Sequence, residues 1–203
     1  LVRHANDAYA QQRTFTENAA HELQTPLAIA INKLELLAEE GADEEQRMAG
    51  VGEVIGLLER LTRLNRSLLL LARIENRQFP DEQVVAIGTV AMAVVDEFAD
   101  LATHRGVKSH VQVDHELQWR MDPGLARTLI NNLVKNAIVH NVSGGGVWVQ
   151  VRSNGLRVSN TGSGTPLDAA RIFDRFHKES ATPGTGLGLA IVKGIAKLLG
   201  GTV

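Results

Sequence analysis

Two long runs of helical periodicity, separated by one short break, constrain this chain more than any other feature. From about Ala8 to Asn76 there is a single proline, and apolar residues recur at the three- and four-residue spacing of an α-helix. The runs are Phe15, Ala19, Leu23, Leu27, Ile31, Leu34 and Ala38, then Val51, Val54, Leu58, Leu61, Leu68 and Leu71. Between them, Gly41 suits a helix end, and Asp43 suits an N-cap with Gln46 three residues later. The pattern therefore predicts a helical hairpin.

The apolar surface of this hairpin is larger than two helices bury against each other. Ile55, Leu57, Leu64 and Leu69 widen the stripe of the second helix, and a stripe of that width covers more than one facing helix. We therefore expect a homodimer in which two hairpins form an all-α four-helix bundle.

A different pattern follows Pro80, which disfavours helical geometry at Phe79 and ends the second helix. The sequence beyond it predicts helices at 87–104, 122–140 and 187–199, and strands at 107–113, 147–152 and 156–159. Such a mixture is typical of a sheet with helices on one face. The predicted organisation is thus multi-domain, with the helical hairpin over residues 1–77, a linker over 78–84 and an α+β two-layer sandwich over 85–203.

Composition argues against several classes of function. The 21 Lys and Arg residues are balanced by 23 Asp and Glu, so nothing predicts attraction to nucleic acid or an anionic membrane. The absence of cysteine fits a reducing compartment, and we expect the cytoplasm. No run approaches the roughly 20 apolar residues of a membrane-spanning helix. Because the chain opens on Leu1-Val2 without a methionine, we expect a fragment of a longer protein.

The residues around His21 carry the most specific chemistry. We expect Leu23 and Leu27 to face the core and His21, which lies off that stripe, to face solvent. A lone surface histidine is most often only solvated. Here Glu22 is placed to hold or deprotonate one imidazole nitrogen, whereas Gln24 and Thr25, three and four residues on, share the helix face of the histidine.

Pro26 follows within the same helix, where proline costs about 3 kcal/mol and frees a carbonyl, which is tolerable if a bend beside the histidine is useful. The sequence His21-Glu22-Leu23-Gln24-Thr25-Pro26 resembles the H box, HE-x-x-TP, of bacterial sensor histidine kinases. The resemblance implies that His21 accepts the γ-phosphoryl group of ATP with Glu22 as general base. It further implies transfer to an aspartate on a response-regulator receiver domain, and hydrolysis of that phospho-aspartate with help from Thr25 and Gln24. The chain would then be the catalytic portion of a membrane-bound sensor.

Asn132 and Asn136 have the i, i+4 spacing that places two amides on one face of the helix predicted at 122–140. Asparagine is unfavourable inside helices, so two on one face need a reason. The segment 129–137 resembles the N box of the same family, which implies that Asn136 binds the Mg²⁺ bridging the ATP phosphates, with Asn132 close by. Relatives carry a basic residue and an aromatic where this chain has Val139 and His140. His140 has two equally good interpretations, stacking near the adenine or a polar helix end.

The segment Asn160-Thr161-Gly162-Ser163-Gly164 follows a predicted strand and resembles the G1 box, in which Gly162 and Gly164 let the backbone approach the base. Relatives begin this box with an aspartate that accepts a hydrogen bond from the adenine amine. Asn160 offers an amide oxygen without the charge that strengthens such bonds. This difference keeps a catalytically weak pseudokinase open as an alternative.

Two further boxes complete the resemblance. The segment 172–176 resembles the F box, which implies that Arg175, helped by Lys178, contacts the phosphates; the alternative is a surface charge beside two buried aromatics. Gly184-Thr185-Gly186-Leu187-Gly188 resembles the G2 box and opens an apolar helix, offering backbone N–H groups and a helix N-terminus to phosphate. The lid between the boxes, 179–183, is short. Relatives continue beyond Gly200 into two more strands, so we expect the C-terminal edge of the domain to be missing.

Two other classes of function compete. Gyrase, DNA-mismatch-repair and chaperone ATPases share the N box and glycine boxes, and in such an ATPase replacement of His21 would leave turnover intact. The other is a phosphatase-biased or inactive dimeric signalling scaffold, motivated by Asn160 and Val139 and opposed by the retained His21, Glu22 and Asn136. Motifs of P-loop, Rossmann and protein-kinase nucleotide sites are absent from the sequence.

Overall fold

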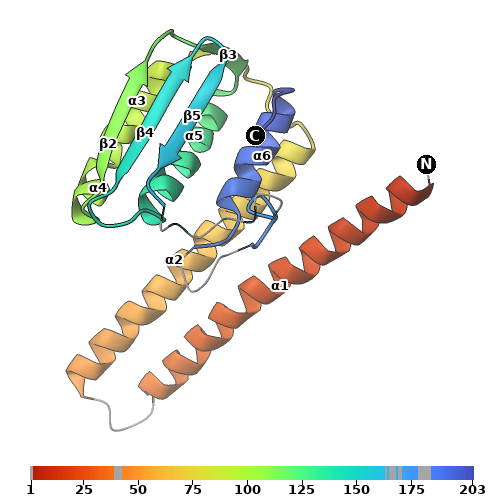
Figure 1. The fold of residues 1–203 in the computed structure, drawn as a ribbon. Helices are drawn as coiled ribbons and strands as arrows, with labels where there is room; N and C mark the ends of the chain where they lie inside the picture. Colours follow the sequence, from red (N-terminus) through yellow and green to blue (C-terminus); the bar gives the residue numbers. More distant parts are fainter. Residues whose placement is uncertain (1, 39–42, 163, 165–167, 169–170, 178–183) are drawn as a thin grey trace. The chain divides into compact units, whose positions relative to one another are not determined.

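The structure is a computed structural model that describes residues 2–38, 43–162, 164, 168, 171–177 and 184–203, with side chains from residue 13 onward. The chain divides into two compact units, Leu1–Leu70 and Leu71–Val203, and Figure 1 labels their helices and strands. The division falls inside the second helix, so the last turns of that helix belong to the second unit. The domain boundary at residue 77 and the linker over 78–84 therefore stay predictions.

Two helices form the hairpin, α1 (Val2–Ala38) and α2 (Glu44–Glu75), and Pro26 lies inside α1 as predicted. The predicted N-cap of α2 is confirmed, because the Gln46 N–H donates to Asp43 Oδ1 at 2.8 Å and the Asp43 N–H donates to Gln46 Oε1 at 3.4 Å. This reciprocal cap satisfies donors that a first helical turn leaves unpaired. The helix end predicted at Gly41 lies outside the described residues.

Small residues pack between α1 and α2. Pro26, Ala30 and Gly50 are buried, and a Cβ added to Gly50 would lie 2.7 Å from a methyl carbon of Leu37, so a larger residue there would require Leu37 to shift. The larger Val54 is also buried on this side of α2. Two ion pairs cross the hairpin and fix which residues of the helices are opposite each other; they are Lys33 with Glu53 and Arg60 with Glu22.

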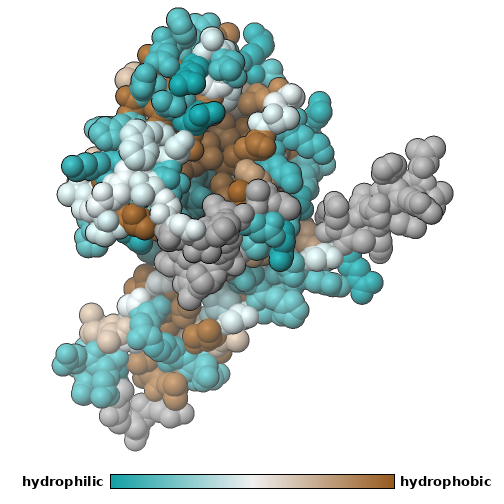
Figure 2. All heavy atoms as spheres, in the orientation of Figure 1, coloured by the Kyte–Doolittle hydropathy of each residue, from teal (hydrophilic) through white to brown (hydrophobic). Residues whose placement is uncertain are grey.

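Only part of the predicted apolar stripe lies beside this packed interface. This part comprises Leu27, Ile31 and Leu34 on α1 and Val51, Ile55 and Leu58 on α2, which expose between 43% and 53% of their surface. Each of these residues comes directly after one that faces the other helix. Because the two helices are antiparallel, residues in that position on α1 and on α2 point to the same side of the hairpin. We call these six residues the open apolar face; Figure 2 shows hydrophobic side chains exposed between hydrophilic ones along the hairpin. Within one chain Leu27 is therefore not buried, because smaller residues fill the space between the helices, and the expectation that it faces the core of a four-helix bundle stays a prediction.

The second unit continues from the end of α2 into a mixed α and β fold. Its elements are β1 (Gln83–Ala86), α3 (Ile87–Glu97), α4 (Ala99–His104), β2 (Lys108–Val113), β3 (Gln118–Met121), α5 (Pro123–Val139), β4 (Gly146–Arg152), β5 (Gly155–Asn160) and α6 (Gly188–Leu198). β1 pairs with β3, and β4 lies between a parallel β2 and an antiparallel β5. Helices α3 and α5 cover one face of this three-stranded sheet (Figure 1). The predicted α+β two-layer sandwich is confirmed.

Alternation along β4 shows which side of the sheet carries the core. Val147, Val149 and Val151 are at most 1% exposed and face the helices, whereas Trp148 between them is 44% exposed. The facing side of α5 contributes Ile130, Val134 and Ile138, which are all buried. Burying a side chain of this size stabilises by about 1.5–3 kcal/mol. The core therefore holds α5 against the sheet along its whole length and leaves its other face for polar residues.

Two strands and one helix break were not predicted. β1 and β3 have four residues each and pair from Gln83 with Met121 to Ala86 with Gln118. The helix predicted over 87–104 is wrong at Phe98, where the chain turns between α3 and α4 and the Phe98 N–H is shared by the carbonyls of residues 94 and 95. The other predicted helices and strands of this unit are present with ends shifted by at most one residue.

Candidate functional site

The predicted amide pair lies on α5, whose start is fixed by Asp122 as N-cap and by a proline in the first turn. The side-chain N–H of Asn132 donates to the Thr128 carbonyl at 2.8 Å, and Asn132 Oδ1 lies 2.8 Å from the place a Cβ would occupy at Gly188. Asn132 therefore fills the space between α5 and the first turn of α6. Asn136 is half-buried, and no described residue hydrogen-bonds its side-chain amide. The two amides lie four residues apart on one helix but have different surroundings.

The glycine-rich loop before α6 contacts the predicted F box directly. The Phe176 N–H donates to the Gly186 carbonyl at 2.8 Å. Gly186 has φ of +68°, and a Cβ there would lie 2.7 Å from the Phe176 carbonyl carbon. A residue with a side chain fits neither that backbone conformation nor that space. Glycine is thus what allows the loop and the F box to lie together.

The N-terminus of α6 lies at the end of this loop. Leu187 is fully buried and precedes the helix without a side-chain hydrogen bond to cap it. The buried residues of α6, which packs against α5, are Ala190, Ile191, Val192 and Ile195. Backbone N–H groups in the first turn of a helix that lack a side-chain cap are suited to binding an anion. Gly184 is exposed and Thr185 is half-buried beside them.

Arg175 of the F box pairs with Glu75, the last residue of α2. The helix end is packed at the same place, since Leu71 and Ile74 are buried and a Cβ on Gly194 of α6 would lie 3.2 Å from Ile74 Cγ2. All these residues belong to the second unit. Lys178, the predicted helper of Arg175, lies outside the described residues.

The predicted G1 box begins at the last residue of β5. Asn160 is exposed, and its side-chain N–H donates to the Thr161 carbonyl at 3.0 Å, so the amide oxygen is the atom left for a ligand. Asn141, which sequence reasoning missed, joins this box to α5: its amide donates to the carbonyls of Ala137 at 3.1 Å and Gly146 at 2.9 Å. The Gly146 carbonyl also accepts the Thr161 N–H at 3.0 Å. An asparagine just after a helix end was the signal that could have found it.

The remaining predicted residues of this unit lie at the ends of these segments. His140 is the exposed C-cap of α5, and its backbone N–H donates to the Asn136 carbonyl at 3.0 Å. Gly162 is exposed, and Gly164 adopts φ of +82°. The contacts at Asn132 and Asn141 place the G2 loop and the G1 box at α5. The N, G1, F and G2 segments, distant in the sequence, thus meet around one helix.

His21 lies in the first unit on α1 and is exposed, as expected. The Thr25 hydroxyl donates to the His21 carbonyl at 3.0 Å, and Gln24 is exposed on the adjacent surface. Glu22 is half-buried and lies 3.7 Å from Arg60 Nη2 of α2.

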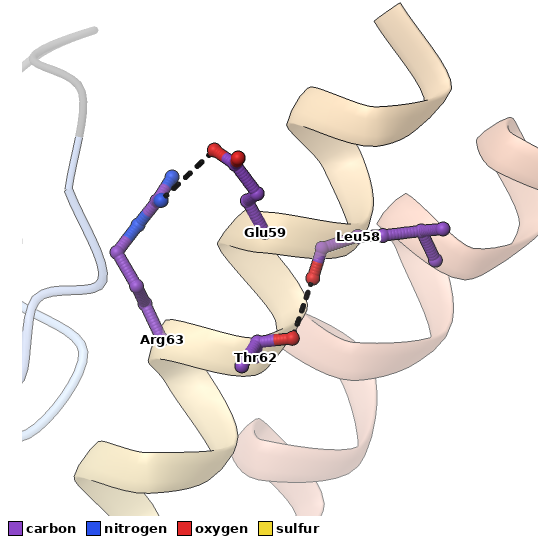
Figure 3. Close-up of polar contacts among 4 residues, drawn as sticks. All are labelled: Leu58, Glu59, Thr62 and Arg63. Carbon is purple, nitrogen blue, oxygen red and sulfur yellow. Dashed lines mark hydrogen bonds and ion pairs between the residues drawn. The ribbon is translucent and has the colours of Figure 1, made fainter. Parts of the chain in front are cut away.

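A second arginine of α2 has a different partner. Figure 3 shows Arg63 and Glu59 pointing toward each other, with 3.4 Å between Nη1 and Oε2, and the Thr62 hydroxyl donating to the Leu58 carbonyl at 2.9 Å. These contacts stay within α2. Arg60, in contrast, links α2 to the residue next to the predicted acceptor histidine.

Both parts of this arrangement match known families. Residues 11–77 match the His Kinase A (phospho-acceptor) domain, and residues 121–203 match the histidine kinase-, DNA gyrase B- and HSP90-like ATPases. A phospho-acceptor hairpin followed by an ATP-binding domain of that kind defines the class of protein. The chain belongs to the bacterial sensor histidine kinases of two-component systems.

Individual relatives agree with this assignment. The sensor protein CutS of Streptomyces coelicolor is 35% identical over 217 residues, an alignment that covers 100% of this chain and 51% of CutS. The Acinetobacter baumannii histidine kinase AdeS has a TM-score of 0.70 at 24% identity, covering 90% of this chain and 88% of that chain. The histidine kinase ThkA, in complex with the response regulator protein TrrA, has a TM-score of 0.70 at 19% identity, covering 98% and 58%. At these identities the two structures show the fold alone, and the chain spans about half the length of CutS.

Two features are absent from the described residues. None of the helices there combines the length and apolar character needed to cross a bilayer. No group of three or more His, Asp or Glu side chains there is placed to hold a metal ion.

Proposed function

We propose that this chain binds ATP with Mg²⁺ at α5, transfers the γ-phosphoryl group to His21, and then passes it to an aspartate of a response-regulator receiver domain. The observation that carries the proposal is the meeting of four segments around α5, with Asn136 as the amide that has no partner among the described residues. Membership of a family of ATPases and of a phospho-acceptor family supports both halves of it.

In the proposed ATP site each segment has its own role. The amide oxygen of Asn160 accepts a hydrogen bond from the adenine amine, and the first turn of α6, after Gly186, donates backbone N–H groups to the phosphates. Asn136 holds Mg²⁺. This assignment fits the chemistry of the ion, which takes oxygen ligands, keeps several waters and uses substrate phosphates in place of a full protein cage. Arg175 supplies positive charge to the phosphates.

At His21 the proposed step is an in-line displacement. An imidazole nitrogen attacks the γ-phosphorus, the bond from that phosphorus to the bridging oxygen breaks, and ADP leaves. Glu22 accepts or holds the proton on the other ring nitrogen, which keeps the attacking nitrogen nucleophilic. The receiver-domain aspartate then attacks the same phosphorus and displaces the imidazole.

The open apolar face is proposed to pack against the same face of a second copy. Six apolar side chains on one side of an exposed hairpin are a surface that association with another hairpin buries. On α1, Glu22 and Pro26 face α2, and His21 and Thr25 come directly before them in the sequence. The residues of the open apolar face instead come directly after residues that face the other helix. The two sets therefore lie on opposite sides of the hairpin, and His21 stays exposed in the dimer.

A response regulator is the proposed partner at that exposed side. ThkA, which shares the fold, is described in complex with one. Thr25 and Gln24 lie beside His21 and are proposed to orient water for hydrolysis of the regulator's phospho-aspartate. The chain is further proposed to be the cytoplasmic catalytic portion of a membrane-bound sensor, in support of which CutS is a sensor protein about twice as long.

The test is incubation of the 203-residue chain with Mg²⁺ and γ-labelled ATP, beside His21→Ala and the control His115→Ala, which removes another exposed histidine. We expect an acid-labile, base-stable label that is lost in His21→Ala and kept in His115→Ala. Label that persists in His21→Ala contradicts the assignment of the acceptor. Nucleotide binding without any label favours the second candidate, a pseudokinase or phosphatase-biased scaffold, which Asn160 motivates because its amide lacks the charge of the usual aspartate.

A further inference from the structure

The last residue of α2 holds an acidic side chain against the arginine proposed to contact ATP. Arg175 Nη2 pairs with Glu75 Oε1, although the two residues are 100 positions apart in the chain. Their side chains are 32% and 40% exposed, so each is partly withdrawn from water. An ion pair in that setting is stronger than one in full solvent but is still exchangeable.

The end of α2 is held firmly enough to keep Glu75 in place. Arg77 adopts φ of +49°, its N–H donates to the Ile74 carbonyl at 3.1 Å, and the Gln78 N–H donates to the Arg73 carbonyl at 3.0 Å. This is the Schellman arrangement that ends a helix. Arg73 also donates to the Gln78 carbonyl at 3.3 Å and lies over the Phe79 ring, 4.8 Å from its centroid. The buried Ile74 then packs beside α6.

Arg175 is fixed from the other side by the glycine loop. Its neighbour Phe176 donates its N–H to the Gly186 carbonyl at 2.8 Å. The arginine therefore lies between a carboxylate on α2 and the loop that leads to the N-terminus of α6. A triphosphate bound at that loop would present negative charge to the same guanidinium.

We infer that Glu75 competes with the nucleotide phosphates for Arg175, so that attachment of the α2 end to the F box and binding of ATP oppose each other. The inference rests on the proposed function of Arg175. Glu75 lowers the affinity for ATP in two ways: it occupies the guanidinium of Arg175, and it adds a negative charge near the phosphates. Coupling of this kind is reciprocal: a movement of α2 that withdraws Glu75 raises the affinity for ATP, and bound ATP weakens the attachment.

The test measures the dissociation constants of ATP and of adenosine for the 203-residue chain and its variants Glu75→Gln, Arg175→Ala and the double variant. We expect Glu75→Gln to tighten ATP binding about fivefold, the scale of one partly exposed ion pair and of modest site coupling. Adenosine, which lacks phosphates, is expected to bind unchanged. In the Arg175→Ala background the Glu75→Gln effect should vanish. The matched control is Glu97→Gln, which removes the same charge from the exposed Glu97–Arg127 pair of the same unit.

Several outcomes would overturn the inference while leaving the proposed ATP site intact. They are equal ATP affinity in Glu75→Gln and Glu97→Gln, a tightening that persists without Arg175, or an equal tightening of adenosine, which would mean a general structural effect. Failure of every folded variant and of the unmodified chain to bind ATP would instead refute the proposed function, and this inference with it.

Discussion

Replacement of Gly186 by alanine tests whether the glycine loop and the F box are joined as their contacts indicate. At φ of +68°, an alanine costs about 1–2 kcal/mol. Its Cβ would lie 2.7 and 2.8 Å from the carbonyl carbon and Cα of Phe176 and 3.1 Å from the His177 carbonyl oxygen. Backbone atoms cannot move aside as a flexible side chain does, and overpacking of this kind adds about 1–3 kcal/mol. The expected strain is therefore about 2–5 kcal/mol.

The strain is released if the loop moves away from the F box. The variant is therefore expected to lose ATP affinity, stability of the second unit, or part of each. We expect the loss in ATP binding free energy and the loss in unfolding free energy of the second unit to sum to at least about 2 kcal/mol, which in binding alone is roughly 30-fold. Calorimetric titration gives the first. Urea unfolding followed by tryptophan fluorescence gives the second, because both tryptophans, Trp119 and Trp148, belong to the second unit. Gly201→Ala is the control in the same unit, since its added Cβ would lie no closer than 3.5 Å to any described atom, the Ala196 carbonyl oxygen. The reasoning is refuted if the two variants match in both measurements.

Three further predictions use the same chain. Asp122→Ala removes the N-cap of α5 and is expected to lower the unfolding free energy by about 1 kcal/mol; an unchanged urea midpoint would contradict this. Ile31→Glu places a charge in the open apolar face and is expected to convert the dimer to a monomer in analytical sedimentation. The control Leu36→Glu, which lies outside that face, is expected to stay dimeric. Asn132→Ala is expected to lower the unfolding free energy by about 1 kcal/mol. Asn136→Ala is expected to leave the unfolding free energy unchanged and to weaken Mg²⁺-dependent ATP binding. The reverse pattern would contradict the different roles given to the two asparagines.

Local signals predicted the fold well because they need no distant partner. The capping pair of Asp43 and Gln46 marks the start of α2 within one turn, and Asp122 before a proline does the same for α5. Alternation of valines along β4 likewise belongs to one strand. Each of these features is stabilised by contacts a few residues apart, so the sequence contains the whole reason for it.

Features that depend on pairing between distant segments were missed. β1 is a four-residue strand because Val85 lies opposite Trp119 of β3, and neither segment alternates for long enough to predict a strand alone. Packing inside the hairpin depends on Gly50 facing Leu37 across two helices. The Glu75–Arg175 pair joins residues 100 positions apart. A single sequence read in short windows contains no signal for such contacts.

The two asparagines of α5 are an example at the candidate site of a difference that depends on contacts outside the local sequence. Their spacing predicted two amides on one face and gave no reason to treat them differently. The structure separates them through residues outside the motif: the amide of Asn132 is used by the Thr128 carbonyl and abuts Gly188 of α6, whereas no described residue hydrogen-bonds that of Asn136. The hydrogen bond to Thr128 and the close approach of Gly188 hold the Asn132 amide between α5 and α6, whereas no described residue holds the Asn136 amide in this way. A motif thus locates the candidate site, but the packing of α6 on α5 decides which of its two amides is held in place.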